Sequence, residues 1–312
     1  MHVDVGPRTD WGVALPIVAG ARDLRSSGEG DLPQVLGEAR LEAGFDTERR
    51  LVSLEARPPA PWTSHLLGTR AGGGFRRRLD ELVPPEDRQS LLRQVLDDLP
   101  AAVLISGYAF MRLARRQGLD PGSLTPPNVL DRMVDLCSGW RAGGVAAQSI
   151  GTGLGVPLQD CPPAPPPSAP AGTDPWAWHD MADLGMDWMR RRRCLDLSVG
   201  PEESFALWAM FRDTVGEPDG TESVLHEYVV RAGGDHGVLT SVEAEPRVLP
   251  FPECPMAADS VSALAGTEMS RLSAAVPEVL EGIASCTHLN DLLRALGGAA
   301  DLLELATVVA TQ

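Results

Sequence analysis

Two side chains that can do chemistry, a cysteine and a histidine, stand together near the end of the chain in the run Ser285-Cys286-Thr287-His288-Leu289. Leucines recur at helical spacing after this run, and Ser285 or Thr287 can cap the exposed N–H groups of a helix that begins there. A thiol at a helix N-terminus is favoured as the thiolate, and histidine exchanges protons near neutral pH. The run therefore predicts a reactive corner suited to proton transfer or nucleophilic attack.

A second group of reactive side chains lies upstream, in His226-Glu227-Tyr228 and Pro252-Glu253-Cys254-Pro255. On a strand His226 and Tyr228 point to one face and Glu227 to the other, because side chains alternate. We expect His226 to approach Cys286 in one site, although 60 positions separate them in the sequence. The predicted catalytic residues are His226, Cys286, His288, Tyr228 and Glu227.

Three functions fit these residues. The first is a cofactor-independent acid–base enzyme of isomerase, lyase or cyclase type, acting on a hydrophobic small molecule or an acyl thioester, with His226 as the base and Cys286 or His288 assisting. The second is non-catalytic binding of a small molecule or a partner, in which case Cys286 is a small buried apolar residue. The third is a zinc site, although the chain has no paired-cysteine spacing. We expect no cofactor and no metal; the zinc alternative would use His226, Cys254, Cys286 and His288.

Charge and composition exclude several other functions. All 27 basic residues are arginine, so Schiff-base chemistry, pyridoxal phosphate attachment and a phosphate-loop lysine are excluded. The net charge of −16 opposes binding to nucleic acid or to an anionic membrane. The dense basic run Arg190 to Arg193 is expected to flank a strand and to meet acidic groups.

The five cysteines are scattered and odd in number, which predicts reduced thiols. The sequence has no basic-plus-apolar leader and no apolar run long enough to span a membrane. We therefore expect a cytoplasmic protein.

The chain reads as a duplication, since similar pieces recur in the same order at an offset near 190 residues. The clearest matches are His2-Val3-Asp4-Val5 with Cys194-Leu195-Asp196-Leu197, Ala21-Arg22-Asp23 with Phe211-Arg212-Asp213, and Val35-Leu36-Gly37-Glu38 with Val224-Leu225-His226-Glu227. Where the second copy has His226 the first has Gly37, and Cys286-Thr287-His288 corresponds roughly to Leu96-Asp97-Asp98. This asymmetry predicts a single site in the second copy.

The predicted fold is α+β: two antiparallel β-meander plus helix units related by a pseudo-twofold axis, with a helical segment between them. Expected strands cover residues 15–25, 34–43, 51–56, 205–211, 224–232 and 238–244. Expected helices start at Trp62 and Phe75 and cover 99–116, 127–140, 258–264, 272–283, one from the reactive run onward, and 299–309. The predicted segments are 1–98 for the first copy, 99–156 for the middle helices, 157–175 for a proline-rich linker and 176–312 for the second copy.

An ordered set of motifs in the second half resembles the bacterial family catalogued as domain of unknown function 2889. The motifs are Arg191-Arg192-Arg193-Cys194, Phe211-Arg212-Asp213, His226-Glu227-Tyr228, Pro252-Glu253-Cys254-Pro255 and Cys286-Thr287-His288-Leu289. The first half is similar to the longer, two-copy members. Such proteins carry a basic segment before the first strand, so we expect either a clipped strand at Met1 or a start codon upstream. The resemblance implies site positions but no activity.

Overall fold

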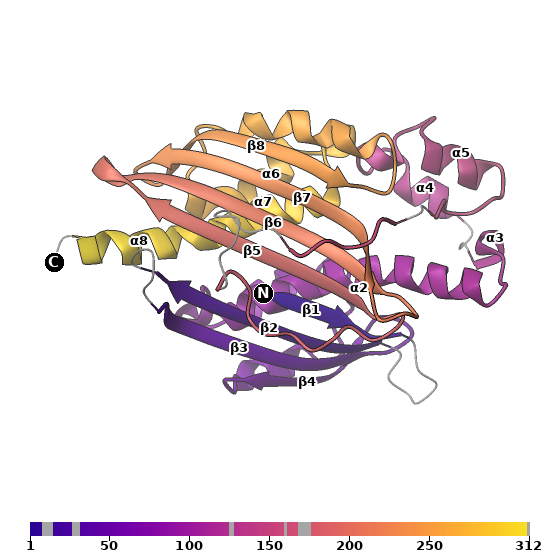
Figure 1. The fold of residues 1–312 in the computed structure, drawn as a ribbon, viewed down its shortest axis with the longest axis horizontal. Coiled ribbons are helices and arrows are strands. Elements are labelled where there is room, and N and C mark those ends of the chain that lie inside the picture. Colours follow the sequence, from indigo (N-terminus) through magenta and orange to yellow (C-terminus); the bar gives the residue numbers. More distant parts are fainter. Residues whose placement is uncertain (8–14, 27–31, 125–127, 159–160, 168–175, 311–312) are drawn as a thin grey trace. The chain divides into compact units, whose positions relative to one another are not determined.

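The computed structural model describes the chain except residues 8–14, 27–31, 125–127, 159–160, 168–175 and 311–312 (Figure 1). Its eight strands form one antiparallel sheet in the order β4-β3-β2-β1-β5-β6-β7-β8. The strands are β1 His2–Val5, β2 Leu15–Arg25, β3 Gln34–Phe45, β4 Leu51–Arg57, β5 Met189–Val199, β6 Ser204–Gly216, β7 Glu222–Asp235 and β8 Val238–Val248. Each run of four strands is a meander, and β1 and β5 pair antiparallel, with Val3 opposite Arg191.

Helices follow each run of strands. The α-helices are α1 Phe75–Leu82, α2 Leu91–Arg116, α3 Pro121–Leu124, α4 Val129–Met133, α5 Val145–Gly151, α6 Leu272–Val279, α7 Thr287–Ala295 and α8 Ala299–Ala310. The longest 3₁₀ helices are Pro61–Leu66 and Cys254–Leu264. None of the described helices is both long and apolar enough to cross a membrane.

The α+β class and the predicted strands are confirmed, and β6, β7 and β8 extend a few residues beyond their predicted ranges. Several predicted helices differ in the structure. The helices expected from Trp62 and over 258–264 are 3₁₀ helices. The helix expected over 127–140 is divided into α4 Val129–Met133 and a 3₁₀ helix Ser138–Trp140, and residue 127 lies outside the described residues. Helix α2 starts at Leu91 and carries Pro100 inside it, whereas the predicted helix starts at Leu99. Helix α6 ends at Val279, and Gly282 beyond it adopts a left-handed backbone with φ of 54°.

The proline-rich segment was predicted to be an exposed linker. Residues 159–160 and 168–175 of it lie outside the described residues. In the described part, Pro163 forms an antiparallel bridge with Ser223, and the Ala164 N–H donates to the Glu222 carbonyl at 2.8 Å. This part of the segment therefore pairs with the start of β7.

The described structure divides into two compact units. One unit comprises Met1–Phe110, Pro163–Arg192 and Asp213–Ser223, and the other comprises Met111–Pro162, Arg193–Arg212 and Val224–Gln312. Strands β5, β6 and β7 each contribute residues to both units. In the first unit, aromatic and leucine side chains of β3, α1 and the 3₁₀ helix Pro61–Leu66 are buried. They are Phe45, Leu41, Phe75, Leu79 and Leu66.

The second unit is built around a sheet covered by helices on one face (Figure 1). Alternate residues of β6 from Phe205 to Phe211 and of β7 from Tyr228 to Ala232 face this core. Helices α6 and α7 supply Leu272, Val276 and a leucine set that includes Leu289 and Leu293. The helical spacing of these leucines explains why α7 lies flat on the strands, since one apolar stripe faces the core.

Candidate functional site

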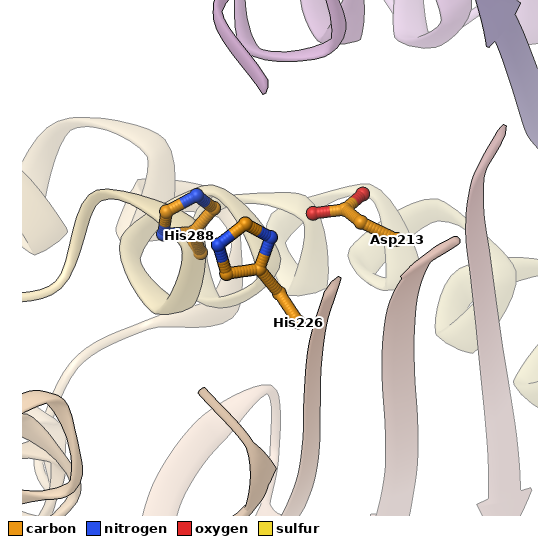
Figure 2. A group of neighbouring side chains, drawn as sticks. All are labelled: Asp213, His226 and His288. Atoms are coloured by element: carbon orange, nitrogen blue, oxygen red, sulfur yellow. The ribbon is translucent and has the colours of Figure 1, made fainter. Parts of the chain in front are cut away.

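An aspartate and two histidines from three different elements meet where β6 and β7 run beside the start of α7. Asp213 comes from β6, His226 from β7 and His288 from α7 (Figure 2). One carboxylate oxygen and one nitrogen of each ring lie within 4.8 Å of one another. Asp213 and His226 are buried, and His288 is partly exposed. The group is the one set of three or more potential metal ligands found among the described residues.

The two imidazole rings are stacked on each other. Their centroids are 4.1 Å apart with an interplanar angle of 21°, and the Phe211 ring lies nearly parallel to that of His288 at 6.2 Å. The strand period explains the meeting, because Asp213 is two residues after Phe211 and His226 two residues before Tyr228, so each continues the core face of its strand. His288 reaches the same point from the first turn of α7.

A buried arginine accompanies the aspartate. The Arg191 Nε lies 3.0 Å from the Asp213 Oδ1, and their side chains are 3% and 0% exposed. A guanidinium remains charged at all physiological pH values. The site thus contains a fixed positive charge next to its one acidic group.

Cys286 lies beside the site but does not have the reactive form that its position predicted. Its Sγ is 3.7 Å from the His288 Nδ1, and the His288 ring is stacked on that of His226. His288 therefore lies next to both Cys286 and His226. Burial raises the pKa of the Cys286 thiol to about 11, although the Leu289 and His288 amides partly oppose the shift. The thiol is therefore protonated at neutral pH. The helix N-terminus favours thiolate, but here desolvation outweighs it.

Tyr228 and Cys254 have structural contacts. The Tyr228 hydroxyl donates to the Cys254 carbonyl at 3.1 Å in the core of the second unit, and burial raises the pKa of both side chains, that of Cys254 to about 12. Glu253 Oε1 accepts from the Val145 N–H at 2.9 Å, at the start of α5. Among the described residues, the group of potential metal ligands therefore consists of Asp213 and the two histidines, and it includes neither Cys254 nor Cys286 of the predicted zinc set.

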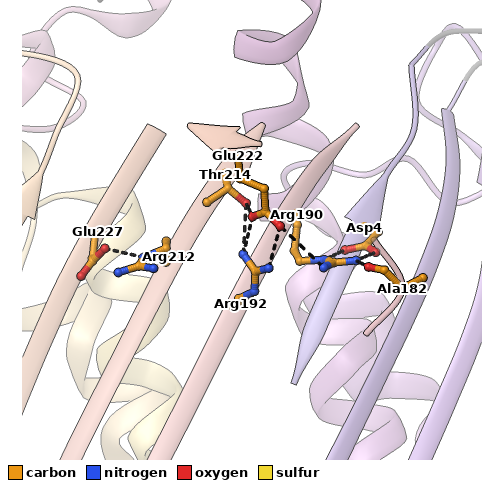
Figure 3. A network of polar contacts seen from close by, with 8 residues as sticks. All are labelled: Asp4, Ala182, Arg190, Arg192, Arg212, Thr214, Glu222 and Glu227. Atoms are coloured by element: carbon orange, nitrogen blue, oxygen red, sulfur yellow. Dashed lines mark hydrogen bonds and ion pairs between the residues drawn. The ribbon is translucent and has the colours of Figure 1, made fainter. Parts of the chain in front are cut away.

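Glu227 points to the opposite face of the sheet, as the alternation predicted. It forms an ion pair with the Arg212 Nε (Figure 3). A second ion pair joins it to the Arg247 Nη1 at 3.3 Å. Arg212 and Glu227 are both buried. Glu227 therefore cross-links β6 and β7 and does not share a pocket with His226.

Two other arginines of the basic run, Arg190 and Arg192, also meet acidic groups, as expected, although they lie within β5 and do not flank it. Arg190 binds Asp4 through two hydrogen bonds of 2.6 and 2.7 Å, and Arg192 binds Glu222 through bonds of 2.6 and 2.8 Å (Figure 3). Burial alone would raise the pKa of Glu222, but hydrogen bonds from Arg192 and Thr214 hold it below its usual value. These ion pairs, with that of Arg191, neutralise three arginines of the run and oppose a role as a phosphate-binding patch.

Sequence reasoning missed Asp213 as a site residue. The signal was present, because Phe211-Arg212-Asp213 recurs in the first half as Ala21-Arg22-Asp23. The predicted meander already pairs these two strands, but the predicted strand ends at Phe211. In the structure β6 continues to Gly216, so Asp213 lies within the strand and faces the same side as Phe211.

Comparison with known proteins gives one match. Residues 189–301 match the model of the family described as Protein of unknown function (DUF2889), which is the family that the motifs indicated. This region contains strands β5 to β8 and the helices that hold the site. Neither the curated proteins nor the solved structures contain a match to this chain.

Proposed function

We propose that the protein is an enzyme that binds one divalent transition-metal ion through Asp213, His226 and His288. The observation that carries this proposal is the convergence of two imidazoles and one carboxylate within 4.8 Å. In a tetrahedral site with metal–ligand bonds of about 2.0–2.2 Å, two ligand atoms of one ion lie about 3.4 Å apart. The most distant pair of ligand atoms therefore needs to close by at most about 1.4 Å, which rotation of the side chains can supply.

The ligand types fit a catalytic rather than a structural metal site. Structural zinc sites use four protein ligands, whereas three ligands leave a position open for water or substrate. Two histidines and one carboxylate are typical of catalytic zinc and of non-haem iron(II). When bound, such an ion polarises a substrate oxygen or lowers the pKa of its water. Asp213 and His226 would hold it on strands, and His288 is the one partly exposed ligand of the three.

Metal analysis of untagged protein tests the proposal. After reconstitution with zinc, cobalt(II) or iron(II), we expect close to one equivalent for at least one ion. Asp213→Asn and His288→Gln should each weaken binding by about 10–100-fold or more, since each removes one of only three ligands. The matched control is Asp23→Asn, which changes the corresponding aspartate of the first half and should bind as the wild type does.

Two results would contradict the proposal: wild-type protein that binds none of these ions, or Asp213→Asn protein that binds as tightly as wild type. Isothermal titration at micromolar protein measures both the stoichiometry and the affinity. Circular dichroism of each variant distinguishes loss of a ligand from loss of the fold.

The ring stacking favours a second candidate, the metal-free acid–base enzyme. In parallel rings 4.1 Å apart, one imidazole can hold a proton while the other accepts one, and Asp213 lies near enough to stabilise an imidazolium. This candidate replaces the first if the wild type binds no metal. Thermal stabilisation by a library of coenzyme A thioesters and aromatic acids would then identify its substrate class; if no compound stabilises the protein and none is turned over, non-catalytic partner binding replaces both.

We also propose that the two halves arose by duplication and form a pseudo-dimer with one site. The strand order, which reads outward from β1 and β5 in two matching meanders, supports this. So does the pairing of Arg22 with Glu38 on β2 and β3, because Arg212 and Glu227 are ion-paired at the corresponding positions.

A further inference from the structure

The charge of the proposed metal site is set by Arg191 as well as by the ligands. Arg191 and Asp213 form a buried ion pair, so the only acidic ligand is already neutralised by a guanidinium. Histidine binds metal as the neutral imidazole. A divalent ion in this group would therefore leave about two uncompensated positive charges at a largely buried point.

The two described carboxylates of β7 nearest His226 along the strand are already paired. Glu227 is paired with Arg212 on the opposite face, and Glu222 is bound by Arg192. Isolated charge in a protein interior is strongly disfavoured unless it is paired. An anion from outside the protein would supply the missing charge.

We infer that the site takes an anionic substrate, a carboxylate or another small oxyanion, and that Arg191 selects it. This inference rests on the proposed metal function. One oxygen of the anion would occupy the open metal position, and the negative charge would be shared with the Arg191 guanidinium. That group has five N–H donors in a planar fork suited to oxyanions, and its Nε lies 3.0 Å from the Asp213 Oδ1. Neutral analogues of the same shape would be rejected.

Removing Arg191 should move two affinities in opposite directions. Without the guanidinium, the carboxylate of Asp213 attracts a cation more strongly, so metal affinity should rise. The anion at the same time loses its partner, so anion affinity should fall. General damage to the fold would lower both, which makes the opposite signs diagnostic.

The test uses the full-length protein loaded with cobalt(II), whose visible absorption reports changes in coordination. Acetate and acetamide, which match in shape but differ in charge, are titrated into wild type, Arg191→Met, Arg191→Lys and the surface control Arg231→Met. Arg231 is an exposed residue of β7 paired with Glu245. Acetate should bind wild type and the control at least about tenfold more tightly than acetamide.

In Arg191→Met protein the preference for acetate should fall by about tenfold, while cobalt(II) binding stays at one equivalent and tightens. Arg191→Lys should retain part of the preference, because it keeps the charge but loses the planar fork. Equal binding of acetate and acetamide by wild type overturns the inference, as does an unchanged preference in Arg191→Met. If Arg191→Met does not fold, Arg191→Lys and the wild-type comparison decide. Wild type that binds no cobalt(II) is a separate result that rejects the proposed function.

Discussion

Arg212→Met should destabilise the protein strongly, because it leaves a buried carboxylate without its main partner. The Arg212 and Glu227 side chains are 2% and 4% exposed, and Arg247, the other partner of Glu227, is 33% exposed. Breaking a buried ion pair from one side typically costs about 3–5 kcal/mol. We expect the free energy of unfolding to fall by about this amount in urea titrations followed by circular dichroism.

Two further variants test whether the loss comes from the stranded charge. Arg247→Met removes a partly exposed partner and should cost only about 0–1 kcal/mol. The double variant Arg212→Met/Glu227→Met removes both buried charges and should be markedly more stable than Arg212→Met alone. A loss below about 1 kcal/mol for the single variant, or a double variant that is no more stable than the single, would refute this reasoning.

Three other predictions follow from burial and charge. In native protein at pH 8, iodoacetamide should label Cys286 at least about tenfold more slowly than the less buried Cys194, because burial raises the pKa of Cys286 to about 11; mass spectrometry showing equal rates would contradict this. Burial and the nearby Arg190 lower the pKa values of His2 and His179 to about 3. Because the unfolded chain takes up these protons near pH 6.5, the free energy of unfolding should fall as pH drops from about 6.5 towards 3. His179→Gln should flatten this part of the profile measured in urea, and an unchanged slope would count against the explanation. The charge of −16 predicts that random duplex DNA is not retained in gel shifts below about 10 µM protein at physiological salt, and retention would overturn this expectation.

The strands were predictable because each is a local pattern. Alternating apolar residues bounded by glycine and proline indicate a strand whatever else surrounds it. The start of α2 was less predictable, since Pro100 is acceptable as the first residue of a helix and unfavourable inside one. In the structure the helix extends nine residues before that proline, to Leu91. Packing against the rest of the fold outweighed the local preference for a helix start near Pro100. A local sequence pattern does not show which residues will pack together.

The candidate site was half predictable for a related reason. The histidines could be chosen by residue type, but the protonation of a neighbouring group depends on how deeply it is buried. Cys286 is 3% exposed, so the same helix start that predicts a thiolate holds a thiol. Asp213 was missed because the predicted strand ends at Phe211, whereas β6 continues through Asp213 to Gly216.

The first half of the chain explains why one site is expected rather than two. Arg22 is the register partner of Glu38, and Asp23 is the partner of Gly37. The aspartate is thus retained at the position that corresponds to Asp213, but glycine provides no ring to meet it. A Cβ added at Gly37 would lie 3.5 Å from the Leu91 Cδ1, so the side chain of α2 approaches the space that an imidazole would need. Replacing Gly37 with histidine alone should therefore not create a second site, because the neighbouring Leu91 of α2 offers no ligand atom; Gly37→His protein that bound a second metal equivalent would show that the aspartate and one histidine suffice.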